Sequence, residues 1–132
     1  MFSTLASPST MYQRVDVESS IDEAAPLHLV VMLYDGVVRH INEAIAALRV
    51  GDIAAKGKAI TKANRILEEG LRASLNQSAG NISRNLNDLY IYMSQRLITA
   101  HRHNDQTILE EVLNLLRPIR DAWKTIERNQ AK

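Results

Sequence analysis

The hydrophobic and polar positions alternate along the chain in a way that predicts four amphipathic helices joined by short polar connections. The first helix is expected over residues 26–50. Its apolar positions recur at steps of three and four in two adjacent lines: Leu27, Val30, Tyr34, Val37, Ile41, Ala44 and Leu48 in one, and Val31, Val38 and Ile45 in the other. An apolar face of this width is typical of a bundle core rather than of a two-stranded coiled coil.

The helix ends carry recognisable start and stop residues. Pro26 suits the first turn of the first helix, and Gly51 suits the left-handed position just beyond its end. The other helices are expected over residues 53–75, 82–103 and 105–127. Asp52 and Asp105 are the expected N-cap residues of the second and the fourth helix.

Glycine and proline inside the predicted helices indicate local features of packing. Gly57 and Gly70 fall within the second helix, and Gly70 belongs to a strip of small residues, so we expect another helix to pack closely there. Pro118 falls within the fourth helix. The apolar pattern continues in phase through Pro118, so we expect a kink there rather than a break.

The third and fourth helices each carry a core stripe with further apolar residues beside it. The third has Ile82, Leu86, Leu89, Met93, Leu97 and Ala100 on its stripe, with Tyr90, Ile91, Tyr92 and Ile98 off it. The fourth has Ile108, Val112, Leu115, Ile119, Ala122 and Ile126, with Leu109, Leu116 and Trp123 beside them. The excess on the third helix predicts either a partner-facing surface or ordinary burial at a bundle corner.

These elements predict an all-α fold, an antiparallel up-down-up-down four-helix bundle over residues 25–128. Residues 1–24 are expected to form a flexible N-terminal arm. Residues 1–10 are rich in Ser, Thr and Pro, whereas residues 11–25 place a few apolar side chains among acids. This second part of the arm is either a solvated tail or a segment that docks against the bundle.

Composition narrows the possible functions. The formal net charge is +1, and the basic residues are spread among acidic ones, so nothing indicates a nucleic-acid partner. There are no cysteines, which excludes disulfides and thiolate metal sites. The longest apolar run, residues 29–33, is too short to insert into a membrane, and the N-terminus lacks the pattern of a signal peptide. We therefore expect a protein that stays in the cytosol.

Catalytic and cofactor sites find no support in the residue spacing. A di-iron bundle needs Glu-x-x-His pairs, which are absent, and His101 and His103 are two apart and point to different helix faces. His40 and His101 lie on helices, as a phosphotransfer histidine would, but without the adjacent Lys-Gly expected there. No Gly-rich phosphate loop or Gly-flanked serine occurs. We expect no catalytic residue, no metal and no cofactor, and hence a binding protein or a self-associating helical structural or adaptor protein.

Several short motifs, in order, resemble the flagellar secretion chaperone family (FliS). They are Tyr12-Gln13-Arg14-Val15, Ala25-Pro26-Leu27-His28-Leu29-Val30, Met32-Leu33-Tyr34-Asp35-Gly36, Gly51-Asp52-Ile53, Ala55-Lys56-Gly57, Asn85-Leu86, Leu89-Tyr90-Ile91-Tyr92-Met93, Arg96-Leu97, Asn104-Asp105 and Asp121-Ala122-Trp123-Lys124. Two positions depart from the family pattern: Ala25 replaces the usual Ser, which removes a side-chain N-cap, and Pro118 is not part of it.

The resemblance implies a non-enzymatic chaperone that binds the C-terminal segment of flagellin and lets it fold into helices against apolar grooves. Premature polymerisation would thereby be prevented, and the cargo would be delivered to the cytosolic domain of the flagellar export gate. The resemblance also implies that Tyr12, Val15 and Val17 of the arm occupy part of the groove when cargo is absent. The free protein would be a monomer or a weak homodimer.

The residues expected to contact flagellin come from the arm and from two helices. They are Tyr12, Val15, Ile60, Ile66, Leu67, Tyr90, Ile91, Met93 and Ile98. For Ile60, Leu67 and Met93 the alternative is simple core packing, while Asp35 and Trp123 are expected to be structural.

Overall fold

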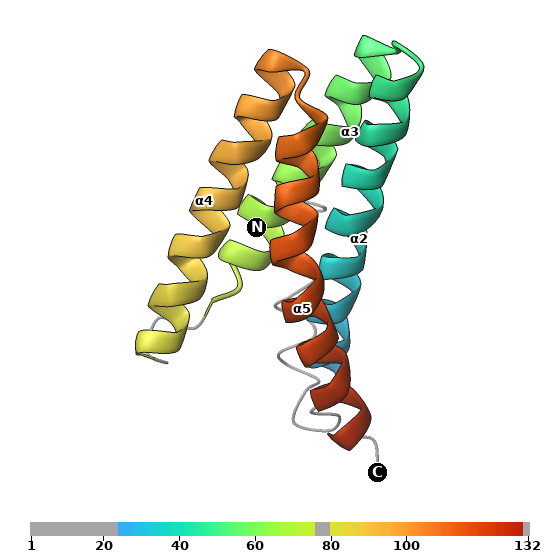
Figure 1. The fold of residues 1–132 in the computed structure, drawn as a ribbon. Helices are drawn as coiled ribbons and strands as arrows, with labels where there is room; N and C mark the ends of the chain where they lie inside the picture. The colour runs from blue at the N-terminus through green and yellow to red at the C-terminus, as the bar shows by residue number, and fades with distance from the viewer. Residues whose placement is uncertain (1–23, 76–79, 131–132) are drawn as a thin grey trace.

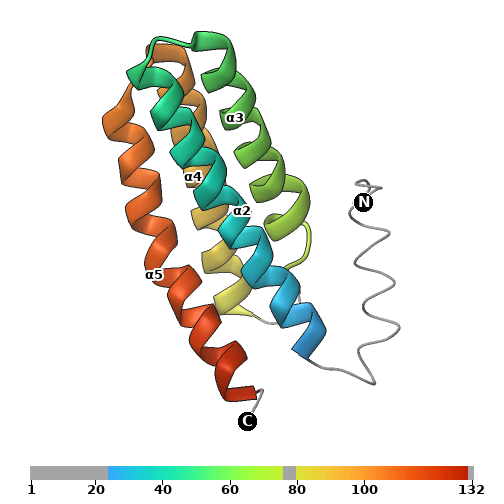
Figure 2. The same ribbon diagram turned by 90° about the vertical axis from the view of Figure 1, so that its right-hand side faces the viewer.

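The computed structural model describes residues 24–75 and 80–130, and the regular structure of these residues is entirely helical. The helices are α2 (Ala24–Arg49), α3 (Ile53–Arg65) continued by the π-helix η1 (Ile66–Arg72), α4 (Asn81–His103) and α5 (Gln106–Gln130). Neighbouring helices run antiparallel, and each packs against the helices before and after it in the order α2, α3–η1, α4, α5, with α5 returning to α2 (Figures 1 and 2). The predicted all-α four-helix bundle is confirmed, while the predicted arm lies outside the described residues.

The turn between α2 and α3 is closed by backbone and side-chain caps. Gly51 has a φ of 76°, its N–H donates to the carbonyl of Leu48 at 3.1 Å, and the N–H of Asp52 donates to the carbonyl of Ala47 at 2.9 Å. This pair of bonds is the Schellman arrangement that ends a helix. Asp52 then accepts a hydrogen bond from the N–H of Ala55 at 3.0 Å, which makes it the N-cap of α3 as expected.

The turn between α4 and α5 also has a left-handed residue followed by a capping aspartate, with asparagine in place of glycine. Asn104 has a φ of 51°, a left-handed conformation that asparagine tolerates. The N–H of Asp105 donates to the carbonyl of Ala100 at 3.0 Å, and the carboxylate of Asp105 accepts from the N–H of Ile108 at 3.3 Å. Because both turns are only a few residues long, the helices that they join must pack antiparallel.

Two expectations for helix ends and interruptions can be compared with the structure. Helix α2 begins at Ala24, so Ala25 lies inside the helix and the interpretation of Ala25 as an N-cap position is wrong. Pro26 is still in the first turn, where no intrahelical acceptor is needed for a backbone N–H. Helix α5 continues through Pro118 without a break, as expected. The expected kink at Pro118 stays a prediction.

The core is one continuous cluster to which all four helices contribute. Its largest fully buried side chains include Tyr34 and Ile41 of α2, Leu67 of η1, Leu97 of α4 and Leu116 of α5. Helix α2 supplies the longest buried row, as its wide apolar face predicts, because it packs against both α3 and α5.

Glycines allow α2 and η1 to approach closely. A Cβ on Gly36 would lie 3.0 Å from Cδ1 of Ile66, and a Cβ on Gly70 would lie 3.2 Å from Cδ2 of Leu33. Contacts of this kind leave no room for a larger side chain unless the neighbour moves. The expectation of close packing at Gly70 is therefore confirmed.

The buried lysine Lys56 joins α3 to the end of α4. Its ammonium lies 2.7 Å from Nδ1 of His101 and donates to the carbonyl oxygen of the same residue at 2.8 Å. Gly57 leaves room for the imidazole, because a Cβ there would lie 3.0 Å from Cε1 of His101. Burial lowers the pKa of Lys56, since it disfavours the charged form. This pair fixes the end of the bundle where α4 meets α5.

An uncovered apolar surface as candidate functional site

The residues of the core stripe of α4 become less buried toward the start of the helix. Leu97 and Met93 are fully buried, Leu89 and Leu86 are half-buried, and Ile82 is 71% exposed. The stripe is unbroken in sequence, so the change reflects what packs against it and not a change in the side chains. The expectation that Ile82 lies in the core is wrong.

The stripe of α5 shows the same change in the opposite chain direction. Leu109 and Leu116 are fully buried, Ile119 and Trp123 are half-buried, and Ile126 is 42% exposed. Because α4 and α5 are antiparallel, the start of α4 and the end of α5 belong to the same end of the bundle. Figure 1 shows the two helices close together at their connection and well apart at these other ends.

We call the apolar side chains at this end the open-end surface. It consists of Ile82, Leu86 and Leu89 on α4 and of Ile119, Trp123 and Ile126 on α5. Leu86, Leu89, Ile119 and Trp123 pack against the core cluster from the side, so the surface is continuous with the core beneath it. Exposed apolar surface that is continuous with a core is typical of sites where a protein or peptide binds.

A pair of tyrosines forms the floor of this end. The hydroxyl of Tyr34 on α2 hydrogen-bonds the hydroxyl of Tyr90 on α4, and the two ring centroids are 6.3 Å apart with the planes tilted by 58°. Burial raises the pKa of Tyr34, an effect that the hydrogen bond with Tyr90 partly offsets. Of the two alternatives for the residues off the core stripe of α4, Tyr90 shows burial, because its ring packs between α2 and α4 and is 2% exposed.

A carboxylate holds α4 and α5 together between their connecting turn and the open end. Tyr92 donates to Glu111 at 2.5 Å, and Arg96 donates to the other oxygen of the same carboxylate at 2.9 Å. These two hydrogen bonds lower the pKa of Glu111, and the bond to Glu111 raises the pKa of Tyr92. Polar contacts therefore join α4 and α5 in the middle of their interface, whereas at the open end the side chains between them are apolar.

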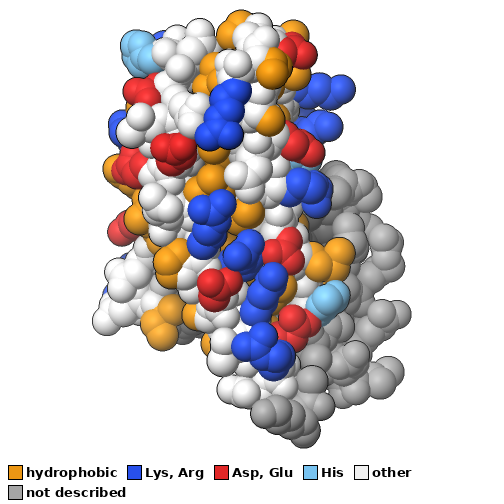
Figure 3. All heavy atoms as spheres, turned by 45° about the vertical axis from the view of Figure 1, so that its right-hand side comes forward, with side chains coloured by type: hydrophobic (Ala, Val, Ile, Leu, Met, Phe, Trp, Pro, Cys, Tyr) orange, Lys and Arg blue, Asp and Glu red, His pale blue; other side chains and the backbone are white. Residues whose placement is uncertain are grey.

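Polar and charged side chains contact one another on the opposite side of the open end, between α2 and α5. Asp35 lies 3.3 Å from the ammonium of Lys124 and 3.8 Å from the guanidinium of Arg120, while His28 lies 2.5 Å from Glu127. Figure 3 shows this side of the molecule, on which basic and acidic side chains alternate along α2 and α5. The alternation gives ion pairs rather than a patch of one sign.

The structure distributes the predicted contact residues over three environments. Ile60, Leu67, Tyr90 and Met93 are buried in the core, Ile66 and Ile91 are half-buried, Ile98 is 48% exposed, and Tyr12 and Val15 lie outside the described residues. Core packing, the alternative weighed for Ile60, Leu67 and Met93, is thus what the structure shows.

The open-end surface was not predicted as a site, because its members share stripes with truly buried residues. In sequence, Ile82 is indistinguishable from Leu97, and Ile126 from Val112, since each pair continues one periodic row. Only the divergence of α4 from α5 separates them. The nearest signal in the sequence is the presence of Trp123 in a motif of the family that the chain resembles.

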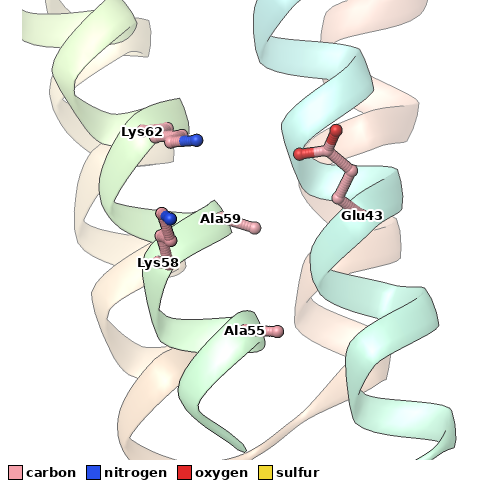
Figure 4. Close-up of a pocket in the computed structure, with 5 residues that line it drawn as sticks. All are labelled: Glu43, Ala55, Lys58, Ala59 and Lys62. Carbon is pink, nitrogen blue, oxygen red and sulfur yellow. The ribbon is translucent and has the colours of Figure 1, made fainter. Parts of the chain in front are cut away.

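A small hollow lies between α2 and α3, next to charged residues (Figure 4). Its volume is about 240 Å³, and its lining residues are Glu43, Ala55, Lys58, Ala59 and Lys62. Glu43 is hydrogen-bonded to His40 at 2.8 Å, which lowers the pKa of the carboxyl group. The hollow is smaller than most small-molecule sites, which occupy about 300–1,000 Å³, and it combines no nucleophile with a base.

The described residues contain neither a metal-binding cluster nor a membrane span. No three His, Asp or Glu side chains in residues 24–75 and 80–130 converge as metal ligands would. In the same part of the chain, no helix combines the length and the hydropathy that crossing a bilayer requires.

A bundle of this kind, with apolar helix surface uncovered at one end, belongs to the class of helical binding proteins. Comparison with known sequences shows the family to which the chain belongs. The profile of the family described as Flagellar protein FliS matches residues 8–130. The chain is 43% identical to the flagellar secretion chaperone FliS of Salmonella typhimurium over 92% of this chain and 90% of the relative.

Two further relatives carry the same description. Identity is 40% with the FliS protein of Escherichia coli, over 86% of this chain and 84% of the relative, and 33% with that of Bacillus subtilis, over 97% and 92%. The chain belongs to the FliS family of flagellar secretion chaperones, which are not enzymes.

Proposed function

We propose that the protein acts in the cytosol, binds the C-terminal segment of flagellin, prevents its premature polymerisation and delivers it to the cytosolic domain of the flagellar export gate. The open-end surface is the observation that supports this proposal. A disordered segment that folds on binding loses conformational entropy, which broad apolar contact must offset. An amphipathic helix laid along the uncovered stripes of α4 and α5 would make such contact.

The proposal places cargo contact on surface that is available in the free protein. Ile82, Ile119 and Ile126 of the open-end surface have apolar area to bury, and Ile91 and Ile98 extend the apolar surface of α4 on its outer side. The core residues Ile60, Leu67, Tyr90 and Met93 are no longer included, because their side chains have almost no area to offer a partner. Tyr12 and Val15 stay predictions.

Calorimetry with a peptide of about the last forty residues of the cognate flagellin tests the proposal, with a shuffled peptide as the control. We expect one-to-one binding, a negative heat-capacity change and a gain of helicity by circular dichroism, since apolar surface is buried as the peptide folds. Absence of binding to either peptide would overturn the proposal. A concentration-dependent dimer that buries the same surface would favour the self-associating alternative.

Single substitutions locate the site. Ile82→Ser and Ile126→Ser are each expected to weaken peptide binding about tenfold or more, because fully burying an isoleucine side chain contributes about 1.5–3 kcal/mol. Val50→Ser is the matched control: Val50 is 79% exposed but lies in the turn at the opposite end of the bundle. Equal losses in all three variants would show that the open end is not the binding site.

A further inference from the structure

Helix α3 concentrates positive charge. Its sequence, Ile53–Arg65, holds four cationic side chains and neither Asp nor Glu, although the formal net charge of the whole chain is only +1. Lys56 is buried, whereas Lys58, Lys62 and Arg65 are exposed. These three residues recur at steps of four and three, so they lie along one face of the helix over about 10 Å. We call them the basic stripe.

Carboxylates of the protein neutralise the basic stripe only weakly. Lys58 and Lys62 form no ion pair and no hydrogen bond within the part of the chain that the structure describes. Arg65 lies 3.9 Å from Glu69, and both side chains are mostly exposed, so this pair contributes little. Glu43, across on α2, is hydrogen-bonded to a histidine of its own helix. The stripe therefore has cationic groups available for carboxylates of a partner.

The basic stripe borders the hollow between α2 and α3 (Figure 4). Ala55 and Ala59 line the hollow beside Lys58 and Lys62, and Glu43 lines it from α2. Because alanine carries only a methyl group, the space of about 240 Å³ is left open above the backbone of α3. A partner that pairs with the lysines can therefore also place a side chain between the two helices.

We propose that the basic stripe and the hollow form a docking site for an acidic helical segment of a second protein. Carboxylates four residues apart on such a helix match the spacing of Lys58 and Lys62. Charge complementarity of this kind gives specificity and speeds association. A nucleic acid fits less well, because three cations neutralise few phosphates and the carboxylate of Glu43 lies at the same hollow.

The docking site lies away from the open-end surface. Ala55 donates its N–H to the cap residue Asp52, which places it beside the α2–α3 turn, at the opposite end of the bundle (Figure 1). The two surfaces share no residue. The inference therefore goes beyond the proposed function and does not depend on it, and an acidic partner can bind while cargo occupies the open end.

A designed peptide serves as the probe. An alanine-based peptide of about twenty residues is long enough to be helical, and Glu at steps of four and three places its carboxylates on one face. In a ¹⁵N-HSQC titration of the full chain, we expect it to shift the amide signals of residues 55–65 and to bind more weakly as the salt concentration rises. A peptide of the same composition with Glu on all faces is the control and should bind less tightly.

Substitutions of exposed residues locate the site without disturbing the core. Lys58→Gln combined with Lys62→Gln should weaken binding of the designed peptide about two- to thirtyfold, the effect of losing two exposed ion pairs. Arg102→Gln combined with Arg117→Gln is the matched control, because it removes the same charge from exposed positions on α4 and α5. Ala55→Gln keeps every charge but fills the hollow, and it should also weaken binding.

Each outcome supports or overturns the inference. No binding of the designed peptide, equal binding of the control peptide, or equal losses in the two double variants would overturn it, and unchanged affinity of Ala55→Gln would overturn the part of the hollow. A DNA duplex of about twelve base pairs that binds more tightly than the peptide and is lost in K58Q/K62Q would make the stripe a nucleic-acid site instead. If the protein binds the acidic peptide but not the flagellin peptide, only the proposed function fails.

Discussion

At the residue scale, Met93 and Ile98 show how differently two apolar residues of one helix can contribute. They lie five positions apart on α4, yet Met93 is fully buried and Ile98 is 48% exposed. Burial depends on which face of the helix carries the residue, and a rotation of 500° over five residues separates these two faces by roughly 140°. Met93 should therefore contribute mainly to stability, whereas Ile98 offers apolar surface that a partner could contact.

Met93→Ala is expected to lower the free energy of unfolding by about 2–5 kcal/mol, because it removes buried atoms and leaves a cavity. Ile98→Ala should change it by less than about 0.5 kcal/mol, as is usual for surface positions. Urea denaturation followed by circular dichroism measures both. Similar effects for the two variants would contradict the assignment of Met93 to the core and of Ile98 to the surface.

The raised pKa of Tyr34 predicts that the protein loses stability at alkaline pH. Burial raises its pKa above the ordinary value of 10.0, so the unfolded chain releases this proton at a lower pH than the folded chain does. Above pH 10 ionisation therefore stabilises the unfolded state, and the free energy of unfolding should fall as the pH rises. Urea denaturation between pH 8 and about pH 11 should show a shallower fall for Tyr34→Phe than for the unmodified protein. Parallel curves would contradict the prediction.

At the element scale, Glu111 links α4 to α5 between their connecting turn and the open end. Tyr92 and Arg96 hold this carboxylate between the two helices at 2.5 and 2.9 Å. Closer to the connecting turn, Leu97 and Leu109 are fully buried, whereas Leu89 and Ile119, closer to the open end, are only half-buried. Glu111 therefore ties α4 to α5 in the part of the bundle where both apolar stripes are still buried.

Glu111 predicts a loss of stability at acid pH. Its hydrogen bonds lower the pKa of the carboxyl group below the ordinary 4.5, so its contribution is complete above pH 4.5 and is lost as the pH falls through the folded-state pKa. Glu111→Gln should remove this part of the acid dependence in thermal melts between about pH 3 and pH 6. Glu110→Gln is the control, because Glu110 bonds only Gln106 of its own helix among the contacts described. An equal effect of both would contradict the role of Glu111.

At the scale of the whole molecule, the two ends of the bundle differ in how firmly they are held. The Lys56–His101 pair and the capped turns close one end, while the apolar stripes at the other end are only partly covered by the described residues. Segments with few buried contacts open locally more often than the core does. The bundle should therefore be rigid where α4 meets α5 and looser where α4 begins.

Hydrogen exchange measures this difference directly. Amides of residues 82–90 and 119–127 are expected to exchange faster than those of residues 93–100 and 108–116, because their apolar faces are less covered. Addition of the flagellin peptide should slow exchange in the first two segments and leave the latter two unchanged. Protection confined to the α2–α3 turn would place the partner at the opposite end.

The sequence by itself determined the helices, their order and their connections, because these depend on periodicity and on local caps. The wide apolar face of α2 and the capping residues Asp52 and Asp105 are visible without any neighbour, and short turns then leave antiparallel packing as the only arrangement. The family motifs added the class of partner. Periodicity could not show how completely the neighbouring helices bury each row of apolar residues.

The tertiary structure alone decided which apolar residues are core and which are surface. Tyr90 lies off the core stripe of α4, which left burial or partner contact open, and it is buried against Tyr34 of α2. Ile82 and Ile126, interpreted as core, are exposed because α4 and α5 separate toward one end. The angle between two helices arises from the packing of all their side chains together, and no single row of residues encodes it.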